Sequence, residues 1–225
     1  MINRLKITLA ISIIAMTALS CNLPTRSTGT APSMTVESTP VSKAAAPAGE
    51  LDYSSAKLQV EDLPSGFREL TEEELQSLGF SSSQFTQAFN GMLSSAQAQN
   101  FAAFINTGSS FEVIVSVLMA PVTTLEGATI DLLMQNPDRL ADELTADSGL
   151  SDFTIDESAT LIGNSSTSAT FSMPDSALEM KGNITVSRRG KALQIALQFH
   201  PAGVQPAINA HTVAEIVDAK LAALE

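Results

Sequence analysis

Residues 177–199 read ALEMKGNITVSRRGKALQIALQF and hold the clearest hairpin signal in the chain. Two β-favouring runs, Ala177–Arg188 and Ala192–Phe199, stand on either side of Gly190, a residue that readily adopts the backbone conformations of a tight turn. Strands joined by so short a connection pair antiparallel. The pattern therefore predicts an antiparallel sheet built around this hairpin.

The segment after the hairpin predicts a helix. Over Asn209–Leu224 the apolar residues recur at helical spacing, which places them on one inward face. These residues are Val213, Ile216, Val217, Leu221 and Leu224.

Further strands are expected upstream. Phe101–Ile105 and Phe111–Met119 form a second predicted hairpin, and apolar residues on both faces of 111–119 are typical of a central strand. The other predicted strands are 57–60, 67–70, 153–162 and 168–173.

Four shorter helices are expected between these strands. Thr71 and Glu74 have the spacing of a capping box, which predicts a helix that ends at Gly79. The others are predicted over 83–94, 124–134 and 137–145. Short helices first, hairpins next and a helix last predict an α+β fold, an antiparallel sheet built from hairpins and flanked by helices, with a C-terminal amphipathic helix.

Residues 51–225 are expected to form one domain, since about 175 residues suit a single core. Two strings in this region, Asp62-Leu63-Pro64-Ser65-Gly66-Phe67 and Arg188-Arg189-Gly190-Lys191 ahead of a last helix, resemble the PsbP-like fold of extracytoplasmic and thylakoid-lumen proteins. The region has 22 acidic and 8 basic residues, a formal charge of −14. Such a charge argues against nucleic acid as a partner, because phosphates are bound by clustered Lys and Arg.

The first residues of the chain have the pattern of a targeting signal. Arg4 and Lys6 precede an uncharged apolar run, residues 7–19, and the only cysteine of the sequence, Cys21, follows it. The run is 13 residues long, whereas a helix needs roughly 20 to cross a bilayer. It therefore predicts the apolar region of a signal peptide.

The string Ala18-Leu19-Ser20-Cys21 resembles the lipobox of bacterial lipoproteins, whose cysteine is acylated on sulfur and becomes the mature N-terminus. That family usually has Leu, Val or Ile three places before the cysteine and a small residue two places before, and here the two are exchanged. The resemblance implies a signal peptide over 1–20 and lipid attachment at Cys21. Cleavage by ordinary signal peptidase, giving a secreted soluble domain, and an uncleaved anchor are the alternatives.

Residues 21–50 are rich in Ser, Thr, Pro and Ala and lack any apolar period, so we expect a disordered tether. Their length gives a flexible coil an r.m.s. span of roughly 30 Å. The tether would hold the domain away from the membrane surface.

Catalytic motifs give little support for an enzyme. The sequence has no Gly-x-Ser-x-Gly, His-Glu-x-x-His or phosphate-binding glycine motif, and we assign no catalytic residue, cofactor or metal. Ser54 and Lys57 match Ser-x-x-Lys, but its partner motifs are missing, so we interpret the match as chance.

Two histidines and one acidic stretch are candidate catalytic or metal-binding sites. His200 and His211 are expected at one edge of the sheet, where they could act in proton transfer or bind a metal, although edge and capping roles are commoner. An acidic stretch could bind calcium, but it lacks the EF-hand spacing and suits a solvated face. Its members are Asp138, Asp142, Glu143, Asp147, Asp152, Asp156 and Glu157.

Half of the basic residues of 51–225 fall on the 177–199 hairpin: Lys181, Arg188, Arg189 and Lys191. They could form a positive tip that contacts an anion or an acidic partner. The alternative is a charged hairpin that protects a sheet edge from aggregation.

The sequence thus predicts a lipid-anchored envelope protein on the extracytoplasmic face of a bacterial membrane. Its domain is expected to be a non-enzymatic binding or interaction module for a protein or small ligand. The alternatives are an envelope hydrolase or other enzyme with a site near His200, and a secreted soluble domain.

Overall fold

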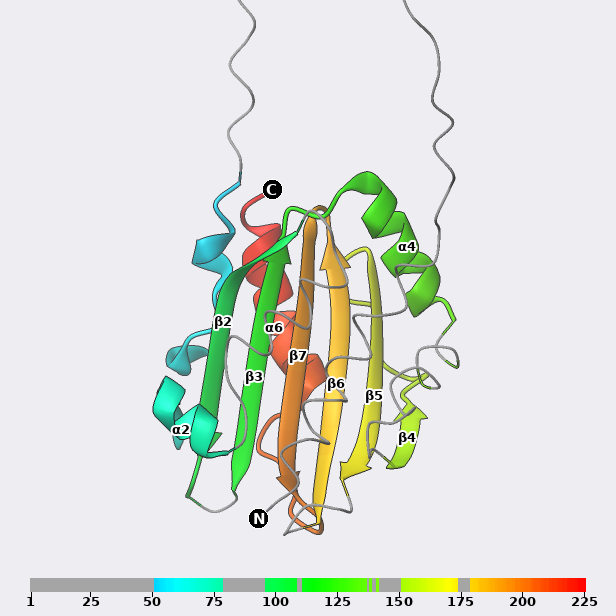
Figure 1. The fold of residues 1–225 in the computed structure, drawn as a ribbon. Coiled ribbons are helices and arrows are strands. Elements are labelled where there is room, and N and C mark those ends of the chain that lie inside the picture. The colour runs from blue at the N-terminus through cyan, green and yellow to red at the C-terminus, as the bar shows by residue number, and fades with distance from the viewer. Residues whose placement is uncertain are drawn as a thin grey trace, which may run out of the picture.

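Seven strands form one sheet in the computed structural model, which describes residues 51–78, 96–108, 111–136, 151–173 and 179–225, together with 138 and 141. The strand order is β1-β2-β3-β7-β6-β5-β4, and every neighbouring pair is antiparallel (Figure 1). The strands are β1 (Phe67–Glu69), β2 (Gln97–Asn106), β3 (Glu112–Ala120), β4 (Ser151–Ile155), β5 (Ser165–Met173), β6 (Met180–Arg189) and β7 (Ala192–Pro201).

The middle of the sheet is β3 and β7, which are far apart in the sequence. All nine residues of β3 are buried, and so are the first nine of β7. Their register pairs Val117 with Ile195 and Val115 with Leu197. A strand buried on both faces needs apolar residues at successive positions, which explains the nearly continuous apolar run of β3.

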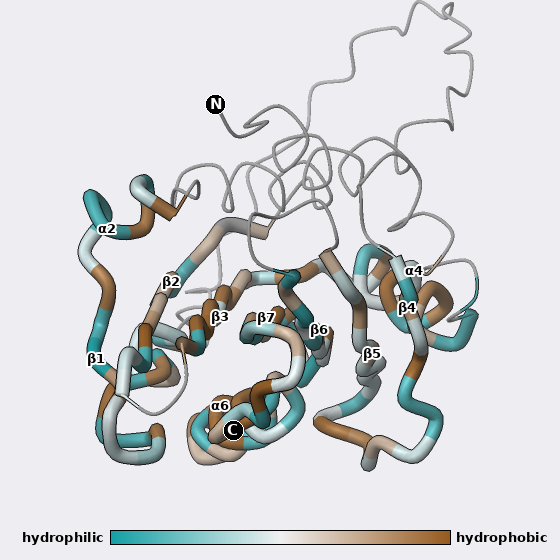
Figure 2. The backbone as a smooth tube through the Cα atoms, turned by 90° about the horizontal axis from the view of Figure 1, so that it is seen from below, coloured by the Kyte–Doolittle hydropathy of each residue, from teal (hydrophilic) through white to brown (hydrophobic). Residues whose placement is uncertain are grey.

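Helix α6 (Ala210–Ala222) covers one face of the sheet and packs on β6 and β7. Asn209 caps it by accepting a hydrogen bond from the Thr212 N–H, and Val213, Val217 and Leu221 are buried beneath it. Figure 2 shows α6 on one side of the sheet and α2 and α4 on the other.

The opposite face is packed against residues of α2 (Glu72–Ser77) and α4 (Thr124–Met134). Leu75 of α2 and Ile130 and Met134 of α4 belong to the same buried cluster as Val115 and Leu193 of the sheet.

Capping boxes fix where α2 and α4 begin. In α2, Thr71 Oγ1 accepts from the Glu74 N–H while the Glu74 carboxylate accepts from the Thr71 N–H. Thr123 and Glu126 repeat this arrangement in α4. Each box satisfies backbone donors that the first helical turn leaves free.

The structure confirms the α+β fold class, the two hairpins, the central position of β3 and the helices at 72–77, 124–134 and 210–222. Two strand predictions were wrong in extent or kind. The strand expected over 153–162 ends at Ile155. Of the strand expected over 57–60, residues 57–59 connect two 3-10 helices, Tyr53–Ala56 and Val60–Asp62. The helices predicted over 83–94 and 137–145 lie outside the described residues, apart from 138 and 141.

The error at 57–60 has a physical reason. Leu58 is buried in the core against α6, so its apolar character reflects burial rather than strand pairing. The Asp52 carboxylate accepts a hydrogen bond from the Ser54 N–H, and this bond favours the helical turn Tyr53–Ala56 that precedes Leu58.

The packing of α6 on the sheet makes a direct prediction. Leu221→Ala should lower the free energy of unfolding by about 2–5 kcal/mol, because this side chain is 4% exposed and its removal leaves a cavity. Leu132→Ala is the matched control on α4, where the leucine is 62% exposed and the change should stay within about 0.5 kcal/mol. Urea denaturation measures both, and equal effects would contradict the described packing.

Candidate functional site

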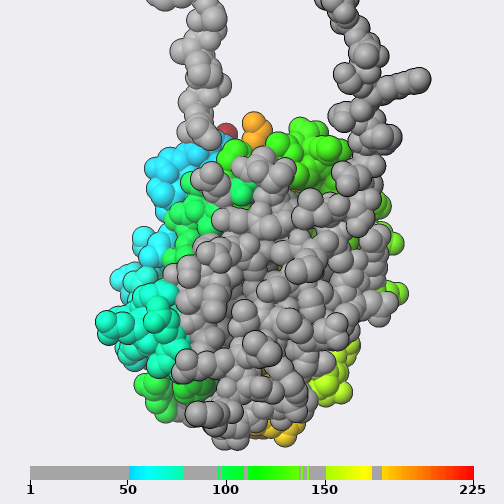
Figure 3. All heavy atoms as spheres, viewed as in Figure 1, coloured from blue at the N-terminus to red at the C-terminus, as the bar shows by residue number. Residues whose placement is uncertain are grey.

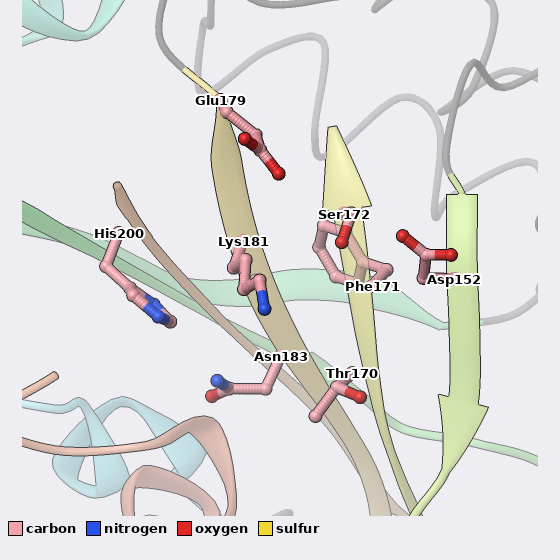
Figure 4. Close-up of a pocket in the computed structure, with 9 residues that line it drawn as sticks. Asp152, Thr170, Phe171, Ser172, Glu179, Lys181, Asn183 and His200 are labelled. Carbon is pink, nitrogen blue, oxygen red and sulfur yellow. The ribbon is translucent and has the colours of Figure 1, made fainter. Parts of the chain in front are cut away.

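A pocket of about 460 Å³ lies at one end of β4, β5, β6 and β7 (Figure 4). His200 lies four residues after Ala196 of the α6-facing core on β7, so both point to the sheet face that α6 covers. Lys181 and Asn183 pair across the strands with His200 and Gln198, so they lie on the same face. The described residues that line it are Asp152, Thr170, Phe171, Ser172, Glu179, Lys181, Gly182, Asn183 and His200. Most of these side chains are polar or charged, so the pocket suits a polar ligand.

His200 is the one histidine of the pocket, and it is 7% exposed. Its Nδ1 lies 3.2 Å from the side-chain amide of Gln198. Burial, and after it the positive charge of Lys181, lowers the pKa of His200 below its usual value of 6.5. The ring is therefore neutral near pH 7, with one nitrogen able to donate and the other able to accept.

A buried hydrogen-bond network holds the side chains of the pocket that lie on β6 and β7. The Glu112 carboxylate, on β3, is fully buried and accepts from Gln198 Nε2 at 3.1 Å and from the Ala207 N–H at 2.9 Å. It also accepts from the Ile208 N–H at 3.4 Å. These three donors compensate a carboxylate that has lost its water.

Asn183 joins this network to the start of α6. Its Nδ2 donates to Gln198 Oε1 at 2.8 Å, and its Oδ1 accepts from the Ala210 N–H at 2.7 Å. The first residue of α6 is thus bonded directly to the floor of the pocket. Both bonds hold the Asn183 side chain in one orientation.

The described lining has one cation, Lys181, and two carboxylates, Asp152 and Glu179. Among the described residues, none of the three takes part in an ion pair within 4.0 Å. Figure 4 shows the Lys181 ammonium near the centre of the lining, between His200 and Asp152. Charges of both signs are therefore present but separated.

The arginines of the β6–β7 hairpin are held by carboxylates of neighbouring helices. Arg188 donates to Asp131 of α4 through Nε at 2.7 Å and through Nη2, and Arg189 donates to Asp218 of α6 at 2.7 and 2.6 Å. Arg189 also lies 3.6 Å from Glu225. Figure 3 shows the orange turn of this hairpin at the same end of the molecule as the green α4.

The four cations of the hairpin do not gather in one place. Lys181 and Arg189 are eight residues apart on β6, or about 26 Å. Lys191 is exposed at the turn, whereas Lys181 lies in the pocket at the opposite end. The arginines thus tie two helices to the sheet, and an anion or partner contact at this hairpin stays a prediction.

His211 contacts a different group of residues from His200. Its Nδ1 lies 3.0 Å from Ser168 Oγ on β5, and its Nε2 lies 3.0 Å from Thr160 Oγ1. It does not line the pocket around His200. The structure therefore places the two histidines in separate environments.

The other sites considered from the sequence can be placed only in part. Lys57 Nζ lies 3.0 Å from Glu69, so in the Ser-x-x-Lys match the lysine pairs with β1. In the described ranges, no three His, Cys, Asp or Glu side chains are grouped to hold a metal ion. Of the acidic stretch, Asp142, Glu143 and Asp147 lie outside the described residues.

Cys21, the signal region and the predicted tether also lie outside the described residues. Within the ranges that the structure describes, no helix has the length and apolar character to cross a membrane.

The sequence interpretation missed the network under α6. Its signal is that the polar residues of an otherwise apolar strand all fall on one face, as with Gln194 and Gln198 in β7. On β6, Asn183 and Thr185 face the same side of the sheet. Glu112 gave a weaker signal, because a single acidic residue at the start of a strand resembles an exposed edge.

Comparisons with known proteins add no relative: no family model, curated protein or solved structure matches this chain. The resemblances to lipoprotein signals and to the PsbP-like fold therefore stay predictions from the sequence.

The environment of His200 predicts its titration. Its pKa, followed by NMR from the ring C–H signals, should lie below 6.5 and should rise in Lys181→Gln, because that variant removes a nearby positive charge. His211→Gln assigns the two histidine signals, and Lys191→Gln is the matched control that should leave the His200 pKa unchanged. A pKa at or above 6.5, or one that ignores Lys181→Gln, would contradict the described pocket.

Proposed function

We propose that the protein is a lipoprotein of a bacterial cell envelope, held at the extracytoplasmic face of a membrane by lipid on Cys21. The observation that carries the proposal is the position of Cys21, the only cysteine, directly after a basic start and a short apolar run. A lone cysteine cannot close an intramolecular disulfide in an exported protein, so lipid attachment gives it a use.

Lipid energetics supports firm attachment. Each buried methylene contributes about 0.8 kcal/mol, and two or more acyl chains anchor a protein where one chain binds only marginally. The residues between Cys21 and the first described element, at Tyr53, have the composition of a flexible tether. Such a tether allows the domain to turn freely and present its surface to soluble molecules.

The domain at the end of the tether is proposed to be a binding module rather than an enzyme. Its pocket of about 460 Å³ has the size of a small-molecule site and a lining of mixed charge. The formal charge of −14 over 51–225 keeps such a domain soluble and away from anionic lipid.

An enzyme acting from near His200 is the second candidate. One observation favours it: His200 lies in a concave pocket beside Lys181, and a histidine of lowered pKa can act as a base near neutral pH. NMR spectra of a ligand incubated with the protein distinguish the enzyme from the binding module. A binding module leaves the ligand chemically unchanged, whereas an enzyme converts it to a product.

Lipid attachment is tested by replacing the cysteine. Cys21→Ser should move the protein from the membrane fraction to the soluble fraction and abolish incorporation of labelled palmitate, because serine offers no sulfur for the diacylglyceryl group. Ser20→Ala is the matched control, since it keeps the cysteine and a small residue before it.

Mass spectrometry of the mature N-terminus shows directly whether Cys21 is the first residue and whether it carries lipid. We expect a peptide that begins at Cys21 and carries acyl chains. An unmodified peptide that begins elsewhere would contradict the proposal and favour a secreted soluble domain.

A further inference from the structure

The separated charges of the pocket indicate which ligand it binds. Apart from Lys181 and the turn residue Lys191, each Lys and Arg in the described part of the chain forms an ion pair with a carboxylate. These residues are Lys57, Arg68, Arg188, Arg189 and Lys220. Lys181 has no ion-pair partner among the described residues, although Asp152 and Glu179 line the same pocket. All three side chains are exposed, so the pocket presents charges of opposite sign to solvent, and no ion pair joins them among the described residues.

One side of the pocket is suited to a carboxylate. Lys181 supplies a positive charge, and the neutral ring of His200 and the amide of Asn183 lie beside it (Figure 4). The Ala210 N–H, at the first turn of α6, is bonded to Asn183, so the positive end of the helix dipole is directed to the same corner. Hydrogen bonds to Gln198 keep both Asn183 and His200 in place before a ligand arrives.

The carboxylates of the pocket are suited to an ammonium group. The Asp152 and Glu179 carboxylates come from β4 and from the residue before β6. In Figure 4, Asp152 and His200 lie on opposite sides of Lys181. Asp152 also has a φ of +51°, a backbone conformation that non-glycine residues adopt at a cost.

From this arrangement we propose that the pocket binds a small zwitterion, an α-amino acid or short peptide, with its carboxylate at Lys181 and its ammonium group at Asp152 and Glu179. A multiply charged anion would meet two carboxylates, and a simple cation would meet Lys181. A zwitterion satisfies both poles at once. The volume of about 460 Å³ has room for a dipeptide.

The experiment is an NMR titration of the full-length protein in detergent with the dipeptide Ala-Ala. We expect saturable shifts of the His200 ring signals and of the amides of residues 179–183. N-acetyl-Ala-Ala and Ala-Ala amide, which each lack one charge, should bind at least about tenfold more weakly, equal to 1.4 kcal/mol. Inorganic phosphate, a simple anion, should bind more weakly than Ala-Ala.

Three variants locate the poles. Lys181→Gln and Asp152→Asn should each weaken Ala-Ala binding at least about tenfold. Lys191→Gln, on the exposed turn at the far end of β6, should leave it unchanged. Thermal unfolding of each variant checks that the fold is intact.

Three results would overturn the proposal: no shift with Ala-Ala up to about 10 mM, tenfold above a Kd of 1 mM; equal binding of the blocked dipeptides; or tighter binding of phosphate. None of these results depends on lipid at Cys21, so failure of the ligand proposal and failure of the anchoring proposal are read from separate experiments.

Discussion

The buried carboxylate of Glu112 is the constraint on which the pocket end of the molecule depends. A fully buried carboxylate is stable only when donors replace its water, and here they come from β7 through Gln198 and from the loop before α6 through two backbone N–H groups. Gln198 in turn bonds to Asn183, which accepts from the first residue of α6. One carboxylate therefore links three strands to the helix that covers them.

This network orients the pocket residues His200 and Asn183. Because Gln198 is held by Glu112 and Asn183, it offers His200 a fixed neighbour at 3.2 Å. His200 and Asn183 are thus oriented by groups outside the pocket, which is how a preorganised site is built. At the other end of the sheet, ion pairs from Arg188 to Asp131 and from Arg189 to Asp218 link α4 and α6 to β6.

Local sequence patterns predicted the fold well where local physics controls it. β-Favouring runs on either side of turn residues predicted the hairpins, the capping box at Thr71 marked the start of α2, and the spacing of Val213, Val217 and Leu221 predicted the buried face of α6. The pattern misled at Leu58, whose burial arises from a contact with a helix more than 150 residues later.

The candidate site was less predictable, because its parts meet only through pairing of distant strands. Register places Lys181 opposite His200, and no local pattern contains that register. For the same reason the hairpin cations suggested one positive tip, whereas strand length separates Lys181 from Arg189 and helix carboxylates neutralise the arginines. His200 itself was identified from the sequence, and its buried partners were not.

Hydrogen exchange of individual backbone amides in Glu112→Gln tests the role of this network most directly. The account predicts faster exchange at Ala207, Ile208 and Ala210, because glutamine replaces an acceptor oxygen with a donor, while the Val117 amide in the middle of the sheet keeps its protection. Glu215→Gln, an exposed change on α6, should alter none of them. Unchanged exchange at the three amides, or equal acceleration throughout the sheet, would contradict the claim that Glu112 anchors this end of α6.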